Sequence, residues 1–136
     1  MKIIVCLDDY GGMLFNFRRQ SRDRVLISDV MSNLGSQKLY ITEFSEILFS
    51  EYEGKYEIVK DFSNLTDENC VCFVENVDVS PFIDSINEVT VYNWNRVYPR
   101  DFVFDINLEK EGFSLMSSHE FEGYSHENIR KEVYKR

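Results

Sequence analysis

Four arginines stand close together near the start of the chain, and they are the first residues whose types suggest a chemistry. Arg18, Arg19, Arg22 and Arg24 fall within seven residues, with Asp23 as the one acid among them. Guanidinium groups bind phosphates and carboxylates through paired N–H donors, and the free N–H groups at a helix N-terminus attract the same anions. The segment therefore predicts a small-anion site. Solvated charge that offsets an acidic surface is the alternative, and both interpretations stay open.

Further polar residues would complete this anion site. Asp8 and Asp9 directly follow the first apolar run, and ligands of open α/β sheets collect where strands reach their carboxyl ends. Arg96 and Arg100 belong to the stretch NWNRVYPRD, whose residue types suit either a binding loop or a rigid turn around Pro99. The predicted ligand-binding residues are Asp8, Asp9, Asn16, Arg18, Arg19, Arg22, Arg96 and Arg100.

Asp23 and His126 are the candidates for proton-transfer chemistry. A carboxyl group in a partly apolar cleft has a raised pKa and can pass a proton. An Asp in the first helical turn also stabilises the helix dipole, and we favour that structural interpretation for Asp23. His126 lies in GYSHE between Ser125 and Glu127. Adjacent residues cannot form a catalytic triad, because its members converge from different elements, so we expect His126 to be a turn residue or a pH-sensitive contact.

The apolar pattern predicts the elements that position these residues. A continuous apolar run over 2–7 indicates a strand buried on both faces, and Gly11-Gly12 indicates a turn into a loop. A helix is expected from about Ser21, which can cap it, to a stop at Gly35. Its apolar stripe consists of Leu26, Ile27, Val30, Met31 and Leu34.

The middle of the chain alternates between short strands and helices. Strands are expected over 38–41, 56–59, 71–74 and 88–94. Thr42 is expected to cap a second helix over 43–52, with Phe44, Ile47 and Leu48 facing inward. Ser80-Pro81 opens a short helix, since proline suits the first helical position. This order predicts a largely parallel, layered sheet.

The last third has a different pattern. Short apolar segments over 102–106 and 113–121 indicate strands, the second with His119 packed on one face. Gly123 can turn the chain into a final antiparallel strand over 129–134, although Ile129 and Val133 also have helical spacing. We expect one α/β domain over 1–136, a mixed, mostly parallel sheet flanked by helices with a C-terminal antiparallel hairpin.

Composition excludes several classes of function. The net charge of −9 disfavours nonspecific binding to nucleic acid. Cys6, Cys70 and Cys72 stand in apolar runs, which predicts buried, reduced thiols. No segment approaches the length of a membrane span, and the first apolar run is too short for a signal peptide. These features predict a cytoplasmic protein without membrane contact.

Four stretches of the chain carry a family resemblance. They are MKIIVCLDDYGGMLFN, the helix from about Ser21, VENVDVSPFIDSINEVTVYNW, and the tail from EGFSLMSSHEF onward. In order and pattern they resemble the dihydrofolate reductase family. The resemblance implies a shortened version of that fold. It also implies that Asp23 falls near the place of the carboxylate that binds the pterin ring in that family.

The resemblance fails where that family holds its nicotinamide cofactor. The family has a glycine pair before its late helix, whereas residues 75–77 of this chain read ENV. Of a Gly-Arg pair and a Thr at the second helix, only Thr42 is kept. One βα unit that helps form the adenosine pocket is missing between Val59 and Cys70. Without the glycines the backbone cannot approach a pyrophosphate, so we expect no cofactor.

The stretches DDxxGMxFNxRRQSxD, FVEN and GYSHE also resemble a small, uncharacterised bacterial family, some members of which carry the name ribonuclease Z. That zinc enzyme needs an HxHxDH cluster with further ligands. This chain has only His119 and His126, and its cysteines lack zinc spacing. We therefore expect neither that activity nor a metal site.

Three classes of function remain on these grounds. The leading one is a binding protein, not an oxidoreductase, for a small anionic ligand such as a nucleotide or another phosphate-bearing molecule. The second is an enzyme, either a reductase with altered cofactor use or a hydrolase, that uses Asp23 and His126. The third is an interaction module whose arginine-rich face binds an acidic protein partner.

Overall fold

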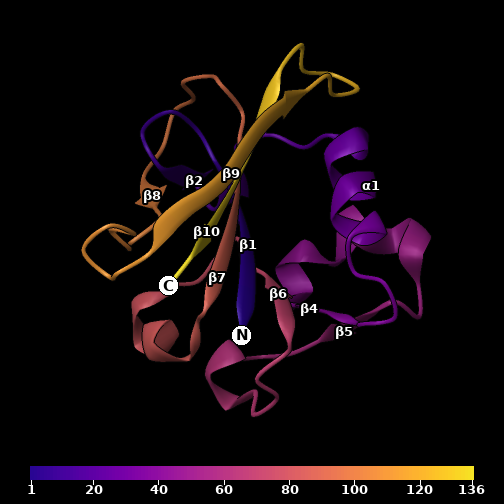
Figure 1. The fold of residues 1–136 in the computed structure, drawn as a ribbon. Helices are drawn as coiled ribbons and strands as arrows, with labels where there is room; N and C mark the ends of the chain where they lie inside the picture. The colour runs from indigo at the N-terminus through magenta and orange to yellow at the C-terminus, as the bar shows by residue number, and fades with distance from the viewer.

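A seven-stranded mixed sheet forms the centre of the molecule, in a computed structural model that describes all residues from 1 to 136 (Figure 1). In spatial order its strands are β5 (Tyr56–Ile58), β4 (Leu39–Ile41), β6 (Val71–Phe73), β1 (Lys2–Leu7), β7 (Glu88–Asn93), β10 (Ile129–Lys135) and β9 (Ser114–Phe121). The first five strands are parallel, and β10 and β9 pair antiparallel at one edge. The predicted sheet with its C-terminal hairpin is confirmed, and the final segment is a strand.

The central strand β1 is covered on both faces, as its unbroken apolar run predicts. Ile3 and Val5 point into a core that includes residues of the short helices η2 (Phe62–Asn64) and η3 (Ser80–Ser85). Ile4 points into a second core, formed with α1 (Arg24–Ser32) and η1 (Glu43–Tyr52). Successive side chains of a strand alternate between faces, so one strand anchors both layers.

Helix α1 begins later than the sequence predicts. Asp23, not Ser21, is its N-cap, because the Asp23 carboxylate accepts hydrogen bonds from the N–H groups of Val25 at 2.9 Å and Leu26 at 3.3 Å. The helix ends at Ser32, and Gly35 takes a positive φ of 63° three residues later. The predicted stripe is buried except for Met31, which is half-buried.

The second helix, η1, is a 3-10 helix with a kink at Phe49. Thr42 occupies the predicted N-cap position, but its hydroxyl donates to Asn76 Oδ1 at 2.9 Å and makes no capping bond to the helix. Ile47 is also not inward-facing, since 61% of it is exposed. Phe49 instead fills the core, where its ring meets the edge of Phe73 at 5.0 Å between centroids.

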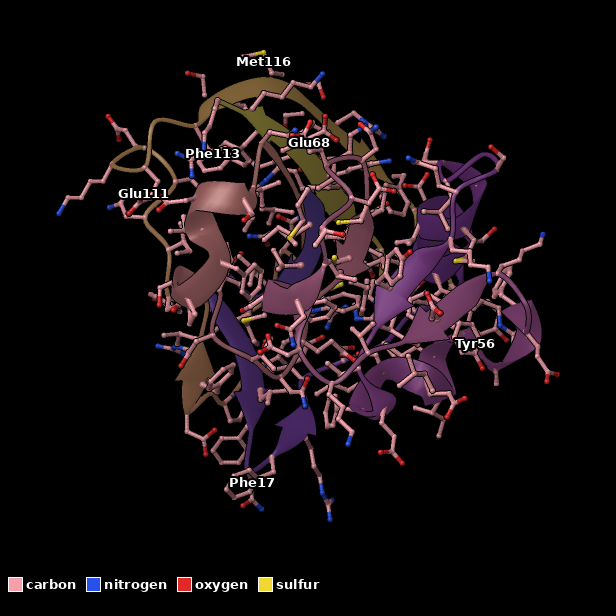
Figure 2. All side chains as sticks on the ribbon, turned by 90° about the horizontal axis from the view of Figure 1, so that it is seen from below. Phe17, Tyr56, Glu68, Glu111, Phe113 and Met116 are labelled. Atoms are coloured by element: carbon pink, nitrogen blue, oxygen red, sulfur yellow. The ribbon has the colours of Figure 1, made fainter.

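The segment after β1 is a hairpin, where the sequence predicts a loop. Strands β3 (Arg18–Arg19), β2 (Gly12–Phe15) and β8 (Phe102–Val103) form a small antiparallel sheet. Asn16 and Phe17 turn the chain with φ of 51° and 62°, as a two-residue hairpin loop requires. Phe17 lies at the outer tip, 89% exposed (Figure 2). The paired strands fix where Arg18 and Arg19 lie.

The outer strand β9 corrects one further expectation. His119 is exposed on this edge strand and is not packed against the core.

All three cysteines are free; Cys70 and Cys72 are buried as predicted, and Cys6 is half-buried. None of the helices combines the length and the apolar character needed to cross a bilayer.

Candidate functional site

The candidate proton-transfer residues Asp23 and His126 lie in direct contact. Atom Oδ2 of Asp23 is 2.9 Å from Nδ1 of His126, and the two side chains are 0% and 4% exposed. Asp23 comes from the segment before α1, and His126 from the loop that joins β9 to β10. The N–H groups of Tyr124 and Ser125 also donate to this carboxylate, at 3.0 and 2.8 Å. The loop therefore closes around a buried acid.

These hydrogen bonds decide the charge of Asp23. Burial opposes ionisation, but the bonds from the Tyr124 N–H, the His126 ring, and the N–H groups of Ser125 and Leu26 outweigh it. Together they hold the pKa of Asp23 well below its usual range. The shift is opposite to the one that a proton donor needs. Asp23 is a charged acceptor at neutral pH, and its role toward His126 is to orient and stabilise the ring.

The other ring nitrogen of His126 faces two hydroxyl groups. Atom Nε2 lies 2.9 Å from Ser21 Oγ and 3.3 Å from the Tyr98 hydroxyl. The ring stacks on Trp94, with 4.5 Å between centroids and 29° between planes. Because a charged carboxylate only accepts, the neutral ring carries its proton on Nδ1 and presents Nε2 as an acceptor. Ser21 is thus linked through His126 to Asp23.

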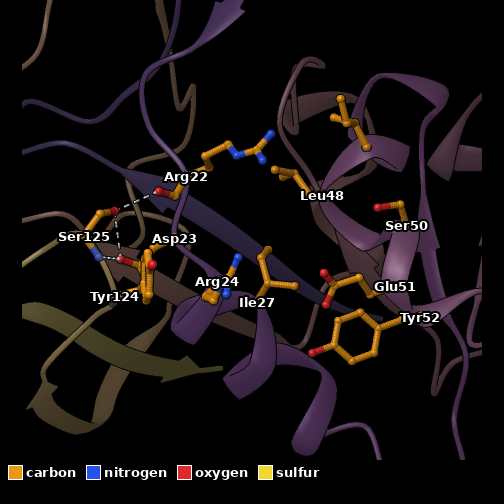
Figure 3. Close-up of a pocket in the computed structure, with 11 residues that line it drawn as sticks. Arg22, Asp23, Arg24, Ile27, Leu48, Ser50, Glu51, Tyr52, Tyr124 and Ser125 are labelled. Carbon is orange, nitrogen blue, oxygen red and sulfur yellow. Dashed lines mark hydrogen bonds between the residues drawn. The ribbon is translucent and has the colours of Figure 1, made fainter.

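A cavity of about 330 Å³ lies beside this cluster, between α1 and η1. Arg22, Asp23 and Ser125 line one side, and Ser50, Glu51 and Tyr52 line the other (Figure 3). The remaining lining residues are Arg24, Ile27, Ile47, Leu48 and Tyr124. The cavity therefore combines polar walls with an apolar patch from both helices.

The cationic side chains of this cavity are free of ion pairs. Arg22 and Arg24 form no salt bridge with any acid of the chain. Arg24 rests on the ring of Tyr124, with its guanidinium carbon 4.7 Å from the centroid. In Figure 3 the Arg22 side chain extends toward Leu48. Asp23 already accepts from the N–H groups of Val25 and Leu26, so an anion in this cavity would bind mainly to the guanidinium groups.

The structure places Arg19 elsewhere. Its guanidinium forms a two-pronged pair with Glu75, at 3.0 and 3.1 Å, and also donates to the carbonyl of Phe44 at 2.8 Å. Glu75 is nearly buried and also accepts from the Ser45 hydroxyl at 2.8 Å. This pair occupies the carboxyl end of β6, where the dihydrofolate reductase resemblance implies a glycine pair. Arg19 therefore links the hairpin strand β3 to residues after β4 and β6, and it does not line the cavity between α1 and η1.

The other predicted ligand-binding residues are spread over the same edge of the molecule. Asn16, Arg18 and Arg19 line a second cavity of about 290 Å³ together with Tyr98. Arg100 stacks on Tyr10, with its guanidinium carbon 4.4 Å from the ring centroid.

Asp8 and Asp9 lie in the turn after β1, and Arg96 lies beside them in the loop after β7. The Asp8 carboxylate is buried and accepts from the N–H groups of Tyr10, Gly12 and Tyr98 and from the Gln20 amide. These bonds outweigh burial and lower the pKa of Asp8. The backbone N–H of Asp9 donates to the Arg96 carbonyl at 2.9 Å. Asp8 thus stabilises the turn from within.

Ser21, Trp94 and Tyr98 belong to the His126 cluster without having been predicted there. The spacing of Ser21 and Asp23 holds a usable signal, because residues two apart on an extended segment share a face. The residues around His126 carry no local pattern that predicts its contact with Ser21 and Asp23. No group of three His, Cys, Asp or Glu side chains is arranged to hold a metal ion.

A third cavity, of about 670 Å³, lies at the carboxyl ends of β4, β5 and β6. It is lined by Thr42, Glu43, Phe44, Ile58, Val59, Lys60, Asn76 and Val77. It offers one cationic residue, Lys60, and one acid, Glu43, whereas the cavity between α1 and η1 offers two arginines.

No model of a known protein family matches the chain, and no curated protein matches its sequence. Its three-dimensional structure is similar to that of a dihydrofolate reductase from Enterococcus faecalis, solved in complex with NADP(H) and RAB-propyl. The TM-score is 0.68 over 99% of this chain and 95% of that chain, at 8% sequence identity. The fold is dihydrofolate-reductase-like. The identity is too low to carry an activity across, and neither comparison supports the resemblance to the bacterial family or to ribonuclease Z.

Proposed function

We propose that this dihydrofolate-reductase-like chain is a binding protein for a small anionic ligand, held in the cavity between α1 and η1. The observation that carries the proposal is that Arg22 and Arg24 both line this cavity and form no ion pair, although Asp23 and Glu51 also belong to its lining. Two adjacent cations repel each other, and a bound anion removes that repulsion. A nucleotide or another phosphate-bearing molecule has the required charge.

The rest of the cavity suits the uncharged part of such a ligand. Ile27, Ile47 and Leu48 supply apolar surface from both helices, and Tyr52 and Tyr124 add two rings. A volume of about 330 Å³ lies within the range of small-molecule sites, which combine apolar walls with a few polar anchors. The anchors would be the two arginines and the Ser50 hydroxyl.

The binding role does not include nicotinamide chemistry. The carboxylate of Glu75 at the end of β6, paired with Arg19, would have to give way before a pyrophosphate could approach that backbone. Its side chain fills space beside that backbone, and the pairing with Arg19 holds it there. The proposal is therefore a scaffold with a reductase-like fold and no site for the reductase cofactor.

Titration calorimetry with inorganic phosphate and with AMP, at constant ionic strength, tests the proposal. The matched variants are Arg22→Gln with Arg24→Gln against Lys38→Gln with Lys110→Gln, which removes the same charge from exposed sites outside the cavity. We expect the arginine variant to bind at least about tenfold more weakly, since charge-assisted bonds to an anion contribute about 1.5–3 kcal/mol each.

The lysine variant should bind like the parent. Equal weakening in both variants would mean that only net charge matters, and absence of binding in the parent would end the proposal. A loss seen instead in Arg18→Gln would move the site to the second cavity, beside Asn16 and Tyr98.

A further inference from the structure

Three side chains lie in line at the entrance to α1. Ser21 Oγ is 2.9 Å from His126 Nε2, and His126 Nδ1 is 2.9 Å from Asp23 Oδ2. We propose that they act as nucleophile, general base and orienting carboxylate, and that the chain hydrolyses small carboxylic esters through an acyl-serine. This activity does not depend on anion binding: Ser21 and His126 do not line the cavity between α1 and η1, and Asp23 is the one residue that the array and the cavity share.

The protons of this array are placed as the reaction requires. Asp23 is ionised and buried, so its carboxylate accepts a hydrogen bond from the Nδ1–H group of the neutral ring. Nε2 then has its lone pair directed at the Ser21 hydroxyl. Stacking on Trp94 fixes the plane of the ring. The Tyr98 hydroxyl, at 3.3 Å, is the more distant of the two groups that face Nε2.

Of the three side chains, the proposed nucleophile is the one that solvent and substrate can reach. Asp23 and His126 are buried, whereas Ser21 keeps part of its surface accessible. Its side chain has no other hydrogen-bond partner in the protein. The backbone N–H groups of Ser21 and Arg22 donate to no acceptor within the chain. Free N–H groups beside a nucleophile can stabilise the oxyanion that develops on the substrate.

The reaction balances without a metal or cofactor. Ser21 Oγ bonds to the ester carbonyl carbon as its proton moves to His126 Nε2. The bond from that carbon to the alcohol oxygen then breaks, and His126 returns the proton to the leaving alcohol. Water attacks the acyl-Ser21 in a second cycle of the same steps, which releases the acid and restores the serine.

Labelling with phenylmethylsulfonyl fluoride, located by peptide mass spectrometry, tests the nucleophile, and p-nitrophenyl acetate tests turnover. We expect one adduct, on Ser21. Ser21→Ala should abolish both readouts, and the half-exposed position makes this variant safe for folding. Ser28→Ala, which removes an exposed serine from α1, is the matched control and should react like the parent.

The base is tested by His126→Gln, which keeps an amide to donate to Asp23 but cannot accept the serine proton. It should slow labelling by roughly 10²–10⁴-fold. Where this variant unfolds, Ser21→Cys replaces it: His126 should then make the new thiol react with iodoacetamide faster than the half-buried Cys6 does. No adduct on the folded parent, an adduct at Ser125, or equal labelling of Ser21→Ala would overturn the proposal.

Discussion

The Nδ1 atom of His126 lies 2.9 Å from Oδ2 of Asp23, although 103 positions of sequence separate the two residues. This contact joins the loop between β9 and β10 to the start of α1. Both side chains are buried, so the hydrogen bond between them replaces one that water would otherwise make to each. The same contact caps a helix, closes a loop and orients the imidazole ring toward Ser21.

Asp23→Ala should destabilise the protein by about 3 kcal/mol or more. It removes a helix N-cap, which costs about 0.5–2 kcal/mol, and leaves the buried His126 ring and two N–H groups without an acceptor, at about 1–3 kcal/mol. Urea unfolding measures the change. Asp84→Ala, which removes an exposed acid with no hydrogen bond, should stay within about 0.5 kcal/mol of the parent. Equal stability of the two variants would contradict the account of Asp23.

Stability should decrease as the pH falls below about 4, which is near the unfolded pKa of Asp. Asp8, Asp23, Asp29 and Asp105 all have folded pKa values lowered by hydrogen bonds that outweigh burial. For Asp29 these bonds come from Lys131 at 2.7 Å and the Tyr92 hydroxyl at 2.5 Å.

The sign follows from proton binding. Below the unfolded pKa the unfolded chain binds more protons than the folded one, so acid favours unfolding. The contribution of these residues is complete above the unfolded pKa and disappears as the pH falls through each folded pKa. Urea unfolding at a series of pH values measures the slope, which should be shallower in Asp23→Asn. A free energy of unfolding that rises toward acid would be inconsistent with these shifts.

Arg19→Ala should destabilise the protein by about 3 kcal/mol, because it leaves the nearly buried Glu75 carboxylate without its cation. Adding Glu75→Gln to this variant should recover part of the loss, since the neutral amide can still accept from the Ser45 hydroxyl. Urea unfolding of the two single variants and the double variant gives the coupling directly. Strict additivity would show that Arg19 and Glu75 do not interact in solution.

NADPH should not bind at micromolar concentration. The Arg19–Glu75 pair stands at the carboxyl end of β6, and it would have to break before a pyrophosphate could approach the backbone there. Fluorescence of Trp94, the single tryptophan, reports on the cluster around His126 and is suited to the titration. Saturable quenching by micromolar NADPH that is displaced by NADP⁺ would contradict the assignment.

Much of the fold follows from the sequence because apolar periodicity is a local signal. The run over 2–7 predicts β1 with its observed bounds, and the turn expected at Gly123 followed by the segment 129–134 predicts β10. The start of α1 is harder to predict from the sequence, since Ser21 and Asp23 are both good N-cap residues. Only the tertiary contacts decide between them: the Ser21 hydroxyl lies against His126 Nε2, whereas Oδ1 of Asp23 accepts from the helix N–H groups and Oδ2 from His126.

The candidate site is predicted only in part for the same physical reason. Asp23 and His126 are recognisable by residue type, but their contact depends on how the β9–β10 loop packs against α1. The arginine cluster predicts an anion site without separating Arg19, which Glu75 neutralises, from Arg22 and Arg24, which stay unpaired. Long-range pairing of charges leaves no trace in a local pattern.

The most direct measurement of the proposed function is a nuclear magnetic resonance titration with AMP that follows the arginine Nε–H signals and the backbone amides. Binding in the α1–η1 cavity predicts saturable shifts of the Arg22 and Arg24 side-chain signals, together with the amides of Ile27, Leu48 and Tyr124. The Arg19 side chain, locked on Glu75, should stay unchanged. Shifts confined to Arg18 and Tyr98, or linear shifts that phosphate and chloride produce equally, would contradict an anion site between these two helices.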